Sequence, residues 1–137
     1  MRVYFDSSIV LRVVLGERGQ LAEWSRTSEA VTSEITRVEC VRVLDRLRVS
    51  SGMPDRELAR RRGTALKVLS GIEQVRLNRA VLSRAADPFP TQIRTLDALH
   101  LASALLFRAR FPAMRFATHD ADLAAAALAE GMSVIGV

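Results

Sequence analysis

The segment Val3-Tyr4-Phe5-Asp6-Ser7-Ser8 (residues 3–8) joins a short apolar run to an aspartate and two serines. β-Branched and aromatic residues favour a strand, whereas Asp and Ser favour the start of a helix. Short runs that contain β-branched or aromatic residues recur at residues 30–33, 74–77, 115–118 and 133–137, and helical patterns fill the gaps between them. This alternation predicts an α/β fold in which a mainly parallel sheet carries helices on both faces.

Apolar periodicity predicts the positions of the helices. They are expected at residues 7–15, 21–28, 38–51, 54–69, 80–86, 95–110 and 121–130. The third and fourth should form a helical hairpin, with an apolar stripe made by Val38, Val41, Leu44 and Leu47. This hairpin is interpreted either as core or as a groove for a partner. The helix at 95–110 is apolar on nearly every side, so we expect it to be buried between the sheet and another layer.

The composition is that of a folded globular protein. The chain has 137 residues, 49% hydrophobic and 26% charged, which fits one domain spanning residues 1–137. The longest apolar stretch, residues 98–107, is too short to cross a bilayer, and the N-terminus lacks a signal-peptide pattern, so we expect a cytoplasmic protein that does not contact a membrane. Cys40 is the only cysteine, which excludes an intramolecular disulfide and a cysteine-based zinc site and favours a small buried side chain.

The net charge favours an anionic partner. Twenty basic residues, nineteen of them arginine, face fifteen acidic ones, giving +5. Residues 74–119 hold seven arginines but only two acids, Asp87 and Asp97. Arginine makes forked contacts with phosphate, so this stretch is compatible with nucleic-acid binding. It is equally compatible with an ordinary solvated surface.

Four acidic residues are placed to meet at one edge of the predicted sheet. Asp6 directly follows the first strand, and Asp120 follows the strand at 115–118 after one residue. Glu39 and Asp97 lie near the starts of helices whose preceding segments return to that edge. Ligands of open parallel sheets bind at the carboxyl ends of the strands, so these carboxylates are expected to converge. Such an oxygen-only cluster suits Mg²⁺ or Mn²⁺, and ions of this kind activate water for phosphodiester hydrolysis without a covalent protein nucleophile.

Each acid has an alternative structural role. Asp6, Ser7 and Asp120 can serve as helix N-caps, and Asp122 can complement a helix dipole from the first turn. Glu39 can close a capping box with Thr36 or pair with Arg42 or Arg46 on its own helix.

Asp97 is harder to explain structurally, because it opens an otherwise apolar helix and a buried charge requires a partner cation. His100 lies three residues further on and is interpreted as a hydrogen-bond partner of Asp97 rather than a base. His119 is interpreted either as a contact to RNA or water or as a surface residue. Trp24 is expected to pack on the core or against a partner helix.

Four motifs in order carry a resemblance to a known family. They are VYFDSS at residues 3–8, TSEITRVE at 32–39, RTLDALHLA at 94–102 and FATHDADL at 116–123. With these motifs, the sequence resembles PIN domains, and among them the VapC-type toxins of prokaryotic toxin–antitoxin pairs. The resemblance spans nearly the whole chain, and the four motifs together are more specific than any one alone.

The resemblance implies particular roles for particular residues. Asp6, Glu39, Asp97 and Asp120 take the places of the family's catalytic, metal-binding acids. Ser7 and Thr118 occupy the small hydroxyl positions of the same pocket, and Asp122 is a further candidate metal ligand.

The resemblance also implies a fold, an activity and partners. The fold is a three-layer α/β/α sandwich, the activity is that of an endoribonuclease, and the cofactor is Mg²⁺ or Mn²⁺. The partners are RNA, a VapB-like antitoxin and a second copy in a homodimer. The mechanism suggested is in-line attack of an activated water on the RNA phosphorus, leaving a 5′ phosphate.

Three other functions remain open. A housekeeping PIN-type nuclease that processes RNA has the same motifs. A non-catalytic partner-binding module can retain the fold, although all four acids are present here. An aspartyl-phosphate phosphohydrolase also begins with an aspartate after its first strand, but that chemistry usually needs a second aspartate two residues later, where this chain has Ser8.

Overall fold

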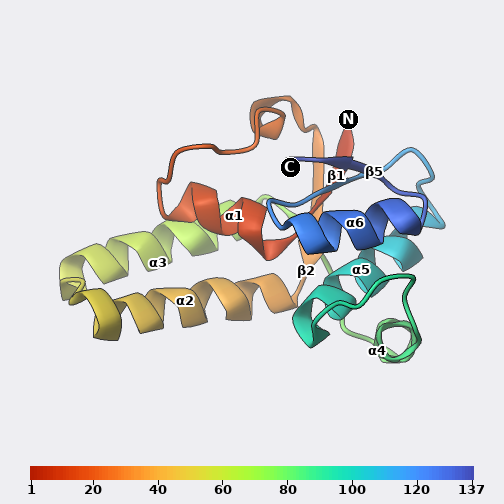
Figure 1. Ribbon diagram of the computed structural model, residues 1–137. Helices are drawn as coiled ribbons and strands as arrows, with labels where there is room; N and C mark the ends of the chain where they lie inside the picture. Colours follow the sequence, from red (N-terminus) through yellow and green to blue (C-terminus); the bar gives the residue numbers. More distant parts are fainter.

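A five-stranded sheet forms the centre of the protein, whose computed structural model describes residues 1–137 (Figure 1). All strands are parallel, in the order β3-β2-β1-β4-β5. The strands are β1 (Arg2–Phe5), β2 (Glu29–Ser33), β3 (Glu73–Val75), β4 (Arg115–Ala117) and β5 (Ser133–Ile135). The five strands predicted from the sequence are therefore present, with differences of one or two residues at their ends.

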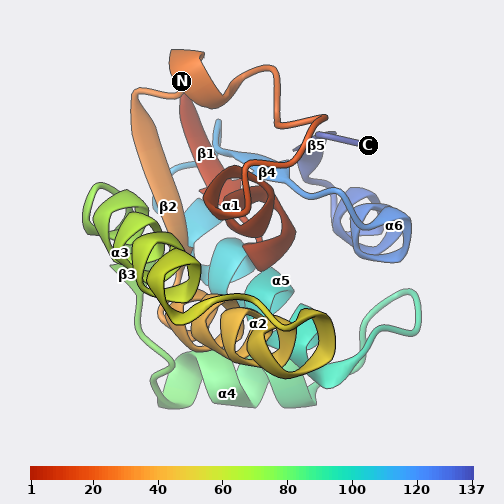
Figure 2. The ribbon, with the colours of Figure 1, turned by 90° about the vertical axis from the view of Figure 1, so that its left-hand side faces the viewer.

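Six α-helices cover the two faces of this sheet. They are α1 (Ser7–Val14), α2 (Ile35–Ser51), α3 (Asp55–Ser70), α4 (Arg79–Ala86), α5 (Thr95–Arg108) and α6 (Ala121–Ala129). Helices α1, α2 and α3 lie to one side in Figure 1, and α4, α5 and α6 lie to the other. Figure 2 shows α2 and α3 side by side, as expected for a helical hairpin. The predicted three-layer α/β/α sandwich is thus confirmed. None of these helices is long and apolar enough to cross a membrane.

Strand β1 is buried on both faces, which explains its unbroken apolar run. Val3 and Phe5 belong to the cluster under α1, α2 and α3, whereas Tyr4 belongs to the cluster under α5 and α6. Successive side chains of a strand point to opposite faces, so three consecutive residues supply both cores. Because β1 is central, the residue that follows it lies in the middle of the sheet's carboxyl edge.

The helix predicted at residues 21–28 is wrong. This segment contains only a 3₁₀ turn at Trp24–Arg26 within a longer loop, and no side chain caps it. Leu21 is its only buried residue, so the segment lacks the repeated apolar positions that hold an amphipathic helix against a core. Trp24 stacks on Phe5 with ring centroids 5.0 Å apart, so it packs on the core. This was one of the two roles expected for Trp24.

The predicted stripe on α2 is only partly in the core. Leu44 is buried, but Val38 is 52% exposed. A spacing of three residues drifts around a helix of 3.6 residues per turn, so the ends of such a stripe leave the buried face.

The strand order places a crevice between β1 and β4. From β1 the chain continues to β2 and β3 on one side, and later to β4 and β5 on the other. Such a reversal separates the loops that follow the two adjacent strands, and open α/β sheets bind ligands there. The amide of Asp6 donates to the carbonyl of Ala117 at 3.1 Å, which ties the two strand ends together.

Gly136, just after β5, is expected to be intolerant of a side chain. Its φ is +98°, and a Cβ there would lie 2.7 Å from the backbone carbonyl of Thr118. We expect Gly136→Ala to lower the free energy of unfolding by about 2 kcal/mol or more, because backbone strain and a backbone clash add. Gly52→Ala is the matched control: its φ is +65°, but nothing lies within 4 Å of the added Cβ. Urea unfolding should show the larger loss for Gly136→Ala, and equal losses would contradict the clash.

Candidate active site

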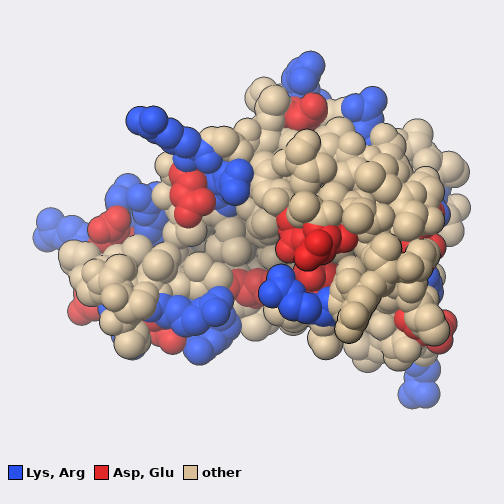
Figure 3. Space-filling model, in the orientation of Figure 1, with Lys and Arg blue, Asp and Glu red and all other residues tan.

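Four carboxylates share one pocket at the carboxyl edge of the sheet. The pocket measures about 500 Å³ and is lined by Asp6, Glu39, Asp97 and Asp120, together with Ser7. Asp6 and Asp120 directly precede α1 and α6, Glu39 lies in the second turn of α2, and Asp97 lies in the first turn of α5. Figure 3 shows acidic side chains gathered near the centre of one face, with basic side chains beside them. The fold thus brings together residues that are up to 114 positions apart.

Asp6 is held rigidly by neighbours from β4 and α1. Its side chain is only 3% exposed and caps α1 by accepting from the amide of Ser8. Its other oxygen accepts from the hydroxyl of Thr118, which in turn accepts from the amide of Asp120 at 3.0 Å. Thr118 is fully buried, so it orients two acids from behind the pocket. The alternative capping role of Asp6 is therefore real and coexists with its place in the pocket.

Glu39 is held from two sides. The hydroxyl of Ser7 donates to its Oε2 at 2.9 Å, and the Nε2 of His100 lies 2.6 Å from its Oε1. The predicted pairing of His100 with Asp97 is therefore wrong. A step of three residues places both near one side of α5, but the ring points toward α2 instead.

Two other expected partners of Glu39 are absent. Arg42 pairs with Asp45 at 3.1 Å, and the hydroxyl of Thr36 bonds to that of Thr32 at 2.7 Å. Helix α2 also begins one residue before Thr36, so Thr36 is not at the capping position. Sequence patterns within one helix did not reveal the long-range donor that holds Glu39.

Tyr4 completes this chain of hydrogen bonds from inside the core. Its hydroxyl lies 3.0 Å from the Nδ1 of His100. Burial raises the pKa of Tyr4 well above its usual 10.0, so the hydroxyl keeps its proton. One ring nitrogen of His100 is thus held by Tyr4, and the other bonds to Glu39. His100 therefore acts as a positioning residue for Glu39.

Removing the Tyr4 hydroxyl is expected to destabilise the protein. Tyr4→Phe leaves the buried Nδ1 of His100 without its hydrogen-bond partner, which costs about 1–3 kcal/mol. Urea unfolding measures the loss, and the Tyr4–Phe116 ring stacking at 5.4 Å should survive the change. An unchanged unfolding midpoint would show that this hydrogen bond does not hold His100 in place.

Asp97 and Asp120 are bridged by one arginine. Arg94 lies just before α5, with its Nε 3.6 Å from Asp97 and its Nη2 3.6 Å from Asp120. Burial raises the pKa of Asp97 above its usual value, and the nearby charge of Asp120 raises it further, while Arg94 lowers it. The net shift is upward, so the site disfavours the ionised carboxylate and a cation there would be stabilising. Asp120 also caps α6 by accepting from the amides of Asp122 and Leu123.

Asp122 lies beside this pocket rather than in it. It lines an adjoining pocket of about 410 Å³ together with Gln92, Arg94 and Asp97. Its predicted role as a metal ligand stays a prediction.

The donor set of the pocket suits a hard divalent cation. Its possible ligands are carboxylate and hydroxyl oxygens, and the only histidine at its edge, His100, uses both ring nitrogens in hydrogen bonds. In this structure, hydrogen-bond donors of the chain hold the carboxylates of Asp6 and Glu39. No three acidic, histidine or cysteine side chains lie close enough together to hold one metal ion.

His119 and Cys40 take no part in the pocket. His119 Nδ1 is 2.8 Å from the carbonyl of Gly136, so the ring is tied to the C-terminal segment, and its Nε2 is buried without a hydrogen-bond partner. The residue as a whole is partly exposed, and its expected contact to RNA or water stays a prediction. Cys40 is fully buried, and burial raises the pKa of its thiol to about 12, with a smaller contribution from the charge of Glu39. The prediction of a small buried side chain is confirmed, and the thiol is not a nucleophile at neutral pH.

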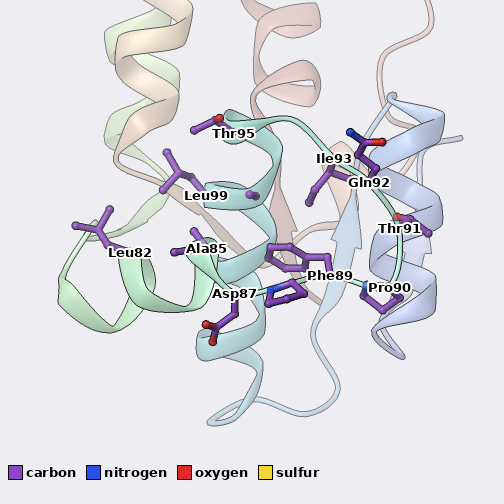
Figure 4. Close-up of a pocket in the computed structure, with 13 residues that line it drawn as sticks. Leu82, Ala85, Asp87, Phe89, Pro90, Thr91, Gln92, Ile93, Thr95 and Leu99 are labelled. Carbon is purple, nitrogen blue, oxygen red and sulfur yellow. The ribbon is translucent and has the colours of Figure 1, made fainter.

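A larger pocket of about 660 Å³ lies nearby, between α4, α5 and the loop that joins them (Figure 4). Phe89 and Ile93 line it from the loop, and Ala85 and Leu99 line it from the two helices. Asp87 is its only titratable residue, so it offers an apolar surface rather than catalytic groups. Size alone therefore does not identify the active site.

The fold is that of a PIN domain. The sequence model of this family matches residues 3–129, so the chain belongs to the PIN domain family.

Within that family the chain is similar to two proteins of Mycobacterium tuberculosis. It is 32% identical to Ribonuclease VapC46 over 136 residues, covering 97% of this chain and 95% of that protein. It is 30% identical to Ribonuclease VapC47 over 126 residues, covering 86% and 84%.

Two solved structures share the fold. A toxin-antitoxin complex from Klebsiella pneumoniae gives a TM-score of 0.65 at 17% identity, covering 89% of this chain and 90% of that one. VapBC-5 from Mycobacterium tuberculosis, of the VapBC family of toxin-antitoxin systems, gives 0.64 at 21% identity and covers all of both chains.

Proposed function

We propose that this protein is a Mg²⁺- or Mn²⁺-dependent endoribonuclease that acts as the toxin of a VapBC-type pair. The observation that carries the proposal is the shared pocket of Asp6, Glu39, Asp97 and Asp120 at the carboxyl ends of β1 and β4. Its support from relatives is the similarity to two ribonucleases over most of the chain.

The four acids hold the cation and the reacting groups in place. Asp6 and Glu39 are the more rigid pair, because every carboxylate oxygen of each accepts a hydrogen bond from the chain. Asp97 and Asp120 form the open side, with side chains 18% and 32% exposed, where an RNA phosphodiester enters. A bound divalent ion supplies activation of water and neutralisation of charge on the phosphodiester. Ser7 keeps Glu39 turned toward the pocket, Thr118 does the same for Asp6, and the Thr118 hydroxyl also holds the backbone amide of Asp120.

The proposed partners are a VapB-like antitoxin and a second copy of the chain. Similarity to two toxin-antitoxin structures supports the antitoxin. The net charge of +5 favours RNA over uncharged substrates and implies binding that weakens as salt rises.

The activity is tested by incubating the purified protein with cellular RNA and Mn²⁺ and sequencing the new ends. Cleavage at defined internal positions with 5′-phosphate ends is the expected result. Products with 2′,3′-cyclic phosphates would indicate a metal-free mechanism and contradict the proposal. Co-expression with any short reading frame found next to the gene then separates a toxin from a housekeeping nuclease, because a cognate antitoxin should bind the protein and silence it.

A further inference from the structure

Arg94 is the only basic side chain that lines the four-acid pocket. It also lines the adjoining pocket with Gln92 and Asp122, so it stands between the two. Its guanidinium bridges Asp97 on α5 and Asp120 before α6, at 3.6 Å from each. The Arg94 guanidinium thus occupies the two exposed carboxylates, Asp97 and Asp120, that a divalent cation would also bind.

The attachment of Arg94 is loose. Both distances exceed the 2.7–2.9 Å of a charge-assisted hydrogen bond, and the side chain is 84% exposed. Exposed ion pairs of this kind contribute little, because solvent screens them. The ion pair of Arg84 with Glu130 provides a contrast, because it closes to 2.9 Å with both side chains largely covered. Arg84 is built into the fold, whereas Arg94 can be displaced.

We propose that Arg94 positions the RNA phosphate. Binding of a divalent cation to Asp97 and Asp120 displaces the Arg94 guanidinium from these two acids, which leaves it free to contact the phosphate. This inference rests on the proposed nuclease function and adds a substrate-binding role for a residue outside the acids. A guanidinium offers a planar fork of donors that fits two phosphate oxygens, and Arg94 can present it at the mouth of the pocket. In this scheme Arg94 opposes cation binding and favours substrate binding.

These two effects have opposite signs in one variant. Arg94→Ala removes a competitor for the carboxylates, so Mn²⁺ measured by calorimetry in the absence of RNA should bind roughly two- to fivefold more tightly. The same variant should lose about 10- to 100-fold in kcat/KM for RNA cleavage at saturating Mn²⁺, mainly through KM, since a phosphate contact is missing. Arg94→Lys keeps the positive charge, so it should bind Mn²⁺ as weakly as the parent does. Its kcat/KM should lie between those of Arg94→Ala and the parent, because lysine lacks the planar fork of donors.

Arg115→Ala is the matched control. Arg115 is exposed at the start of β4, on the opposite edge of the sheet, and forms no ion pair, so its loss removes the same charge without touching the pocket. Its Mn²⁺ affinity should equal that of the parent, and its cleavage should fall only by the general effect of one charge.

Two results would overturn the inference. If the parent binds Mn²⁺ and cleaves RNA but Arg94→Ala behaves like Arg115→Ala in both assays, Arg94 has no positioning role and the nuclease function stands. If the parent neither binds Mn²⁺ nor cleaves RNA, the proposed function and the inference fall together.

Discussion

Asp97→Asn is expected to abolish RNA cleavage while making the folded protein more stable at neutral pH. Asn keeps the shape of Asp but loses the charge that a divalent cation requires, so cleavage should fall by about 10³-fold or more. The gain in stability follows from the environment of Asp97: burial and the nearby charge of Asp120 raise its pKa above 3.8, so the ionised form is disfavoured in the folded state. An active-site acid that costs stability is a common trade-off in enzymes.

The pH dependence of this gain has a definite sign. When the pKa of an acid is higher in the folded than in the unfolded chain, the folded state binds more protons between the two values, and stability falls as pH rises through that window. For Asp97 the window opens near 3.8, the usual value of the unfolded chain. The difference in unfolding free energy between Asp97→Asn and the parent should therefore be near zero below pH 3.8 and grow above it.

Asp55→Asn is the matched control for both readouts. Asp55 also lies in the first turn of a helix, α3, but it is exposed and outside the pocket. Its replacement should leave cleavage unchanged and cost about 0.3–1 kcal/mol through the helix dipole. Cleavage by Asp97→Asn at the parent rate would remove Asp97 from the catalytic site, and a loss of stability at neutral pH would contradict the assigned cause of its pKa shift.

Removal of divalent cations should have the second-largest effect. We expect EDTA to reduce RNA cleavage to background and added Mn²⁺ or Mg²⁺ to restore it, because four carboxylates without a cation repel both one another and the phosphate. The same titration should stabilise the fold, since a ligand at 100 times its dissociation constant adds about 2.7 kcal/mol. The control is Ca²⁺ chelation by EGTA in excess Mg²⁺, which should leave cleavage intact. Full activity in EDTA would contradict metal dependence.

The sequence predicted the fold well because strand and helix periodicities are local. The run at residues 3–5 is apolar throughout, since β1 is covered on both faces, and that pattern is visible without a structure. The helix predicted at residues 21–28 was wrong because the apolar spacing there does not reflect one continuous buried face. Leu21 and Trp24 have the spacing of a helix, yet each packs singly onto the core from a loop.

The position of the acids could also be predicted, because the carboxyl ends of parallel strands share an edge. Their partners could not. The donors that hold Glu39 come from α1 and α5, 32 and 61 residues away, and no periodicity relates them. In the sequence Tyr4 is an ordinary strand residue, and only the structure shows that its hydroxyl bonds to His100. Arg94 stands in the sequence only as part of a motif, and its bridge between two acids depends on the starts of α5 and α6 lying close together in the fold.

The central claim is that four acids distant in sequence form one divalent-cation site. Calorimetric titration of Mn²⁺ into the parent and into Asp6→Asn, Glu39→Gln, Asp97→Asn and Asp120→Asn tests it most directly. The parent should show saturable binding, and each of the four variants should lose at least about tenfold in affinity. Mn²⁺ binding that is unaffected by all four substitutions would contradict it.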